Sequence, residues 1–227
     1  MIGIFDSGVG GMTALAELRR LLPKADITYL ADRKNAPYGT KSEDKILECS
    51  ENCIRRLAEA GAEKILIACC TASTLYPRMS AEAREIALPI IVPAAEMAAK
   101  ASIGGRIAVI ATNATVRSRA FSREIRNLRR VKIMELDAQP LVAMVENGAR
   151  DTLPLSSKDE ELLCEILSPV IAFGADTLVL GCTHFSHLEE HISSRLHGVN
   201  LISPSREGAI RMASMTENRG DGKTVFI

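Results

Sequence analysis

The chain has 227 residues, of which 47% are hydrophobic and 25% charged, and its 28 acidic side chains balance 28 basic ones. Because the net charge is zero, no overall field favours binding to nucleic acid or to an anionic membrane. No apolar stretch approaches the roughly 20 residues that a membrane span needs, and the first residues lack the basic region of a signal peptide, so we expect a cytoplasmic protein.

The chain opens with a strand, a glycine-rich turn and a helix. Residues 1–5 predict the strand, DSGVGG at residues 6–11 the turn, and residues 12–22 the helix. The turn lacks the glycine spacing of a dinucleotide-binding loop, and no phosphate-binding lysine follows it. Asp6 at its mouth would repel a phosphate and would suit an ammonium group, so the turn favours an amine ligand.

A second strand at residues 27–31 ends in Asp32 and leads into a loop. Pro and Gly make residues 35–40 a turn, in which Tyr38 either packs on its own loop or faces a site. A helix is then expected over residues 42–60, with Ser42 as its N-cap.

Two apolar strands end abruptly in a cysteine and a hydroxyl. Residues 64–68 run into Cys69, Cys70 and Thr71, and residues 176–181 run into Cys182 and Thr183. Ligands of open α/β sheets bind at the carboxyl ends of the strands. We therefore expect one sulfur on each side of a substrate.

The stretch between the two cysteine strands begins with a junction. Residues 88–93 are apolar and bracketed by prolines, which confines them to an edge strand or a connector. Helices are expected over 94–101, 116–130, 139–148, 156–173, 189–196 and 208–216, and strands over 106–111, 132–136, 199–203 and 223–227, the last returning to the first half.

The order of these elements repeats. Residues 2–7 match residues 107–112 in pattern, and residues 65–69 match residues 178–182. We therefore predict an α/β protein with two similar three-layer domains, whose mostly parallel sheets face each other across a cleft. Residues 1–93 with 203–227 would form the domain that carries Cys69, and residues 94–202 the domain that carries Cys182.

Other reactive side chains have simpler interpretations. The remaining cysteines, at positions 49, 53 and 164, are expected to be packed hydrophobes. The arginines of residues 117–130 lack interleaved aromatics, so a solvated helix face is favoured over a nucleic-acid surface. The histidines at 187, 191 and 197 are expected at the surface.

Two opposed cysteines could invert a carbon acid. A helix amino terminus lowers a cysteine pKa from about 8.5, so one cysteine could remove a proton as thiolate while the other donates one from the opposite face. His184 could assist Cys182, and Asp32 or Glu146 could hold a substrate ammonium group. A substrate carboxylate could bind to backbone N–H groups and to the hydroxyls of Ser7, Thr71 and Thr183.

Five motifs together resemble the cofactor-independent glutamate racemases of the aspartate/glutamate racemase superfamily, over nearly the whole chain. They are DSGVGG (6–11), APYGT (36–40), AC with TAS (68–69 and 71–73), ATVRS (114–118) and GCTH (181–184). The resemblance implies an isomerase that interconverts L- and D-glutamate for bacterial cell-wall synthesis, without cofactor or metal, and commonly as a homodimer. It implies that Cys69 and Cys182 are the two acid/base residues.

The resemblance also implies a set of substrate contacts and supporting groups. Asp6 and His184 are expected to serve both catalysis and substrate binding, Asp32 to support the substrate and Glu146 to support catalysis. The other implied contacts with substrate are Ser7, Tyr38, Gly39, Thr71 and Thr183.

The chain departs from the family pattern at several points. Cys70 stands at the substrate-binding position where the family has Asn, so a weak S–H donor replaces an amide. Ser186 replaces a usual proline, and the carboxyl end lacks the tail that many members carry.

Three alternatives stay open at this point. The chain could racemise another amino acid such as aspartate, or bind amino acids without catalysis. It could also be a metal or redox-sensing protein, with Cys69, Cys70, Cys182 and His184 as a zinc set, although the usual C-x2-C spacing is missing.

Overall fold

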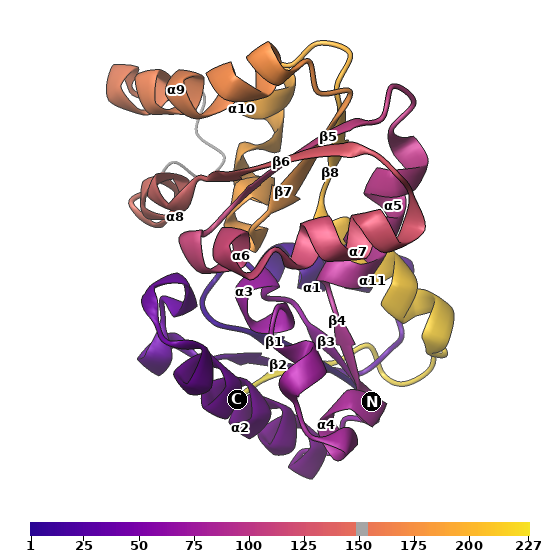
Figure 1. The fold of residues 1–227 in the computed structure, drawn as a ribbon. Helices are drawn as coiled ribbons and strands as arrows, with labels where there is room; N and C mark the ends of the chain where they lie inside the picture. Colours follow the sequence, from indigo (N-terminus) through magenta and orange to yellow (C-terminus); the bar gives the residue numbers. More distant parts are fainter. Residues whose placement is uncertain (149–153) are drawn as a thin grey trace.

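The computed structural model describes residues 1–148 and 154–227 and contains two parallel β-sheets, one above the other in Figure 1. The first sheet has the order β4-β3-β1-β2-β9 and the second β6-β5-β7-β8, and every strand pair is parallel. The strands are β1 (Ile2–Asp6), β2 (Ile27–Ala31), β3 (Lys64–Ile67), β4 (Ala87–Pro89), β5 (Arg106–Ala111), β6 (Lys132–Asp137), β7 (Thr177–Gly181), β8 (Asn200–Ile202) and β9 (Thr224–Phe226).

Helices connect successive strands, as parallel strands require. The α-helices are α1 (Met12–Leu21), α2 (Glu43–Glu59), α3 (Cys70–Ser73), α4 (Ala81–Ile86), α5 (Ile91–Ala101), α6 (Asn113–Ser118), α7 (Ala120–Leu128), α8 (Gln139–Glu146), α9 (Ser157–Phe173), α10 (Glu189–Ser193) and α11 (Pro204–Met215). Short 3-10 turns are η1 (Arg33–Asn35), η2 (Tyr38–Thr40), η3 (Tyr76–Arg78) and η4 (Thr183–Leu188).

The two sheets share one topology. Strands β1 to β4 lie in the order 4-3-1-2, and β5 to β8 in the corresponding order 8-7-5-6. The registers also correspond, because Phe5 pairs with Ile67, two residues before Cys69, and Ile110 pairs with Leu180, two residues before Cys182. The predicted α/β fold with two parallel sheets is therefore confirmed, and β9 joins the first sheet as expected.

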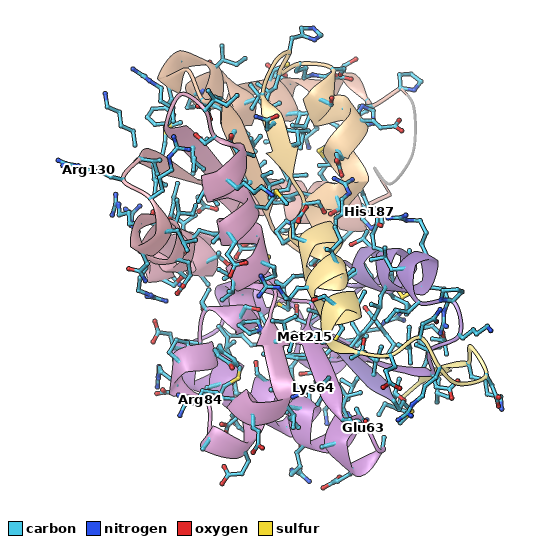
Figure 2. The ribbon with its side chains drawn as sticks, turned by 90° about the vertical axis from the view of Figure 1, so that its right-hand side faces the viewer. Glu63, Lys64, Arg84, Arg130, His187 and Met215 are labelled. Carbon is cyan, nitrogen blue, oxygen red and sulfur yellow. The ribbon has the colours of Figure 1, made fainter. Side chains whose placement is uncertain are left out.

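One apolar core links the two sheets. It contains Ile4 and Leu66 of the first sheet together with Val109 and Val179 of the second, all fully buried. Helix α11 lies along the junction and contacts β3, β4 and β7, as its course above Met215 in Figure 2 shows. The sheets are thus held together by buried side chains as well as by the chain connections. The domain boundaries at residues 93 and 203 stay a prediction.

Three predicted helices differ in the structure. The helix expected over 208–216 is α11, which begins four residues earlier at Pro204. The helix expected over 116–130 is broken at Arg119, whose φ of 54° is left-handed, and it becomes α6 and α7. Helix α5 begins at Ile91 rather than at residue 94, because Pro93 fits the first turn, where no N–H donor is needed.

The structure also corrects two expectations for single side chains. Cys164 is exposed rather than packed, whereas Cys49 and Cys53 are buried as expected. His191 is buried rather than at the surface. Figure 2 shows Arg130 projecting away from the ribbon.

Within the two described ranges, no helix combines the length and apolar character needed to cross a bilayer.

Candidate active site

A small cavity lies at the junction, where the carboxyl ends of β1, β3, β5 and β7 meet. Lys64, at the amino end of β3, lies in the lower half of the molecule in Figure 2, away from the junction. Strand β3 therefore runs from there toward the junction. The cavity volume is about 30 Å³. Its lining residues are Ser7, Gly8, Ala36, Pro37, Tyr38, Gly39, Cys69, Cys70, Thr71, Thr112, Gln139, Val142, Glu146, Cys182, Thr183 and His184.

Cys69 forms one wall of the cavity. It follows β3 and caps α3, so that its Sγ accepts from the backbone N–H of Ala72 at 3.5 Å and lies 3.2 Å from Ser7 Oγ. Burial raises the pKa of Cys69 to about 11, and the nearby Asp6 carboxylate adds to the shift. The expected lowering by a helix dipole is wrong for this cavity, because α3 has only four residues and desolvation outweighs it.

Cys182 is placed in the same way by β7. Its Sγ lies 3.5 Å from Nδ1 of His184, two residues along the chain. Burial raises the pKa of Cys182 well above the ordinary thiol value, and a charge on Cys69 would raise it further. The two thiols therefore interact electrostatically across the cavity, and ionisation of one disfavours ionisation of the other.

His184 connects Cys182 to an acid on another element. Its Nε2 lies 3.3 Å from Oε1 of Glu146, at the end of α8. The distance fits an ion pair, but the angles do not make a hydrogen bond, and Nε2 is buried without a partner of that kind among the described residues. Cys182 and His184 can therefore exchange a proton, and Glu146 places a negative charge beside the His184 ring.

Asp6 lies beneath the cavity rather than in its lining. Its Oδ2 accepts from the backbone N–H of Gly8 at 2.9 Å, and its Oδ1 is buried without a hydrogen-bond partner in the part of the chain that the structure describes. Burial raises the pKa of Asp6, and the nearby His184 opposes the shift. Asp6 is therefore a buried acid between Cys69 and His184.

Tyr38 both packs on its surroundings and lines the cavity. Its ring contacts Phe5 at 6.2 Å between centroids, and its hydroxyl donates to Asp32 Oδ2 at 2.7 Å. Asp32 also accepts from Asn35 Nδ2 at 3.0 Å. Asp32 is not among the lining residues, so its carboxylate holds Tyr38 and does not reach the cavity itself.

Three threonine hydroxyls join the two halves at the cavity wall. Oγ1 of Thr71 lies 3.0 Å from Oγ1 of Thr112 and 3.3 Å from Oγ1 of Thr115, and the last two atoms are 2.9 Å apart. Sequence reasoning missed Thr112, although the internal repeat makes it the counterpart of Ser7. It also missed Gln139 and Val142, which lie on the same face of α8 as Glu146 at helical spacing.

Gly10 allows the first loop to approach η4 closely. A Cβ at position 10 would overlap Thr183 Oγ1 and would lie 2.9 Å from the backbone N of His184. We expect Gly10→Ala to lower the free energy of unfolding by about 1–3 kcal/mol through overpacking and to reduce activity by displacing His184. Thermal unfolding and kcat/KM would check this.

Gly8→Ala is the matched control for Gly10→Ala. Its Cβ would lie 3.9 Å from His184 Cε1, an ordinary contact, so its melting temperature should stay near that of the parent. Equal stability of the two variants would contradict the close-approach argument.

Comparison with known proteins identifies the family. Residues 11–211 match the family Asp/Glu/hydantoin racemase, a range that includes both cysteine strands. The chain belongs to this family. Related racemases include the glutamate racemase of Persephonella marina, 37% identical over 92% of this chain and 80% of the relative, and that of Deinococcus radiodurans, 34% identical over 96% and 75%.

Solved racemase structures have the same fold. Glutamate racemase isoform RacE1 from Bacillus anthracis matches with a TM-score of 0.89 at 29% identity, covering 100% of this chain and 86% of that one. The Francisella tularensis glutamate racemase, solved with D-glutamate, matches with a TM-score of 0.84 at 28% identity, covering 99% and 86%.

The arrangement of Cys69, Cys70, Cys182 and His184 does not support a zinc site. Among the described residues, no group of three or more His, Cys, Asp or Glu side chains is arranged to hold a metal ion. The cavity brings together two thiols that follow strands β3 and β7 of opposite halves, each with its own acid neighbour.

Proposed function

We propose that this chain is a glutamate racemase that interconverts L- and D-glutamate with two cysteines as acid and base. The observation that carries the proposal is that Cys69 and Cys182, at equivalent positions of two sheets, line one cavity. The family membership and the glutamate racemases among the relatives support it.

The reaction needs one thiolate and one thiol at a time. In one direction, the Cys69 thiolate removes the α-proton and becomes a thiol, while the Cys182 thiol gives its proton to the opposite face and becomes a thiolate. The reverse direction exchanges these roles. Since burial raises the pKa of both thiols, the substrate ammonium group would help to form the first thiolate by placing a positive charge beside it.

The neighbouring acids complete the proton path. In the reverse direction Cys182 must start as a thiolate, and His184, 3.5 Å away, accepts the thiol proton before the substrate reacts, while Glu146 supports the resulting imidazolium. Asp6 serves Cys69 in the same way from beneath the cavity. Asp32 acts only through Tyr38, as a positioning residue.

The substrate carboxylates would bind to neutral donors. Hydroxyls of Ser7, Thr71 and Thr183 line the cavity, and we add Thr112, which the threonine cluster holds in place. Tyr38 and Gly39 close one side. We further propose a cytoplasmic homodimer that supplies D-glutamate for peptidoglycan.

The experiment is a racemisation assay on the purified chain without added cofactor. The circular dichroism signal of L-glutamate should decay to zero, and it should do so equally in the presence of a chelator. Aspartate and neutral amino acids form the comparison series. If the glutamate signal stayed constant while that of another amino acid decayed, that amino acid would be the substrate. If all the signals stayed constant, the chain would not be a racemase of these amino acids.

Cys70→Asn tests the main departure from the family. The variant gains a side-chain amide at the cavity wall, so kcat/KM for glutamate should stay at the parent value or rise, by up to about tenfold if the amide reaches a substrate carboxylate. Initial racemisation rates over a range of glutamate concentrations measure this.

Cys70→Ser is the control, because it removes the thiol without adding an amide and should give no gain. A sharp loss of activity in Cys70→Asn would show instead that the Cys70 thiol has a role of its own.

A further inference from the structure

The side chain of Gln139 lines the cavity, and one end of its amide has no hydrogen-bond partner among the described residues. Its Oε1 is buried and makes no hydrogen bond to any described residue. The atom lies over η2, 2.5 Å from where a Cβ on Gly39 would be, so it fills the space that this glycine leaves. A buried end of a side-chain amide without a partner in a cavity wall indicates that a ligand supplies the partner, and rotation about the last torsion can place either the oxygen or the NH2 group there.

The backbone beneath this side chain is fixed. Gln139 is the first residue of α8, and its N–H donates to Asp137 Oδ1 at 2.9 Å. Ala138 is fully buried, and Val142, one turn further along α8, lines the same cavity. The Gln139 amide is therefore presented from a rigid helix start rather than from a mobile loop.

The charges of the cavity wall indicate which group of a ligand the Gln139 amide would bind. Among the described residues that line the cavity there is no lysine or arginine, while Glu146 brings a carboxylate and Asp6 lies just beneath. A substrate with two carboxylates must then be held by neutral N–H and O–H donors. Gln139 carries the one side-chain amide among the described lining residues, and an amide turned about its last torsion offers two N–H donors.

We infer that Gln139 binds a carboxylate of the substrate and supplies, from the second half of the molecule, the amide that Cys70 lacks in the first. The inference rests on the proposed racemase function and goes beyond it by adding a specificity-determining residue. Cys70, 2% exposed and lining the same cavity, offers only a weak S–H donor, so the amide needed for a carboxylate comes from α8.

The first test is Gln139→Ala. A hydrogen bond to a charged group is worth roughly 10- to 100-fold in affinity, so KM for glutamate should rise by about that factor while kcat changes less. Asn147→Ala removes an amide from the end of the same helix, exposed and outside the cavity lining, and should leave KM unchanged. An unchanged KM in Gln139→Ala would overturn the inference.

Gln139→Glu distinguishes donation from acceptance. The variant has nearly the same shape, but an ionised carboxylate only accepts hydrogen bonds and repels a substrate carboxylate. KM should therefore rise at least as much as in Gln139→Ala. If KM stayed at the parent value or fell, the Gln139 oxygen would be binding the substrate ammonium, and the carboxylate assignment would be wrong.

The link to Cys70 is tested by combining substitutions. The rise in KM caused by Gln139→Ala should be smaller in a Cys70→Asn background, because the introduced asparagine restores an amide to the cavity. An equal rise in both backgrounds would overturn the compensation. Melting temperatures of all variants control for folding. If the parent chain were inactive, the proposed function would be wrong, but Gln139 could still bind the substrate. Titration of the parent and of Gln139→Ala with glutamate would then decide whether it does.

Discussion

Cys69→Ser and Cys182→Ser should each lower glutamate racemisation by about 100- to 10,000-fold while the fold stays intact. Serine nearly preserves the volume and the hydrogen bonds of the buried thiol, so Ser7 and His184 keep their neighbours. The hydroxyl, however, is a far weaker acid, and a positioned proton-transfer group contributes about 100- to 10,000-fold to a rate. Racemisation followed by circular dichroism measures the loss.

Cys53→Ser is the matched control for both variants. Cys53 is as buried as the two site cysteines but lies on the apolar face of α2, outside the cavity lining, so its variant should racemise at nearly the parent rate. In deuterium oxide, the parent should also place solvent deuterium at the α-position during turnover. A site serine variant that kept the parent rate would remove that cysteine from the mechanism.

His184→Gln should reduce kcat/KM by about 100-fold. Glutamine can still donate or accept a hydrogen bond near Cys182, but it cannot take up and release a proton, so Cys182 loses its proton-exchanging neighbour. The pH dependence of kcat/KM should change shape as well, which a purely structural role would not produce. Steady-state rates between about pH 6 and about pH 10 would measure both effects.

His191→Gln separates catalysis from folding. His191 is 6% exposed, as is His184, but it lies on α10 and does not line the cavity. Its replacement should lower the melting temperature with little change in kcat/KM. If His184→Gln had the same profile as His191→Gln, His184 would be a structural residue.

The sequence predicted those features of the fold and the site that follow from the order of the strands along the chain. Buried strands that end in a cysteine, and their recurrence 113 positions apart at Cys69 and Cys182, predicted both the sheets and the edge at which the site lies. Parallel topology makes this possible, because the carboxyl ends of such strands must meet at one edge.

Properties that depend on packing could not be predicted. The direction of the Cys69 pKa shift follows from complete burial against a helix of four residues, and neither quantity is visible in the local sequence. The placement of Asp32 behind Tyr38 and the break at Arg119 likewise depend on tertiary contacts. Gln139 was missed because its importance arises from a partnerless atom in a cavity wall, within the part of the chain that the structure describes.

The matching strand orders of the two sheets bear on how such a site could originate. Cys69 and Cys182 occupy corresponding positions in the two copies of the β-strand pattern. Two identical ancestral halves that associated about a two-fold axis would already have placed one thiol on either side of a shared substrate. Such a dimer would act on both mirror images alike, and fusion with later divergence would leave the single, unequal pair of half-sites seen in this chain.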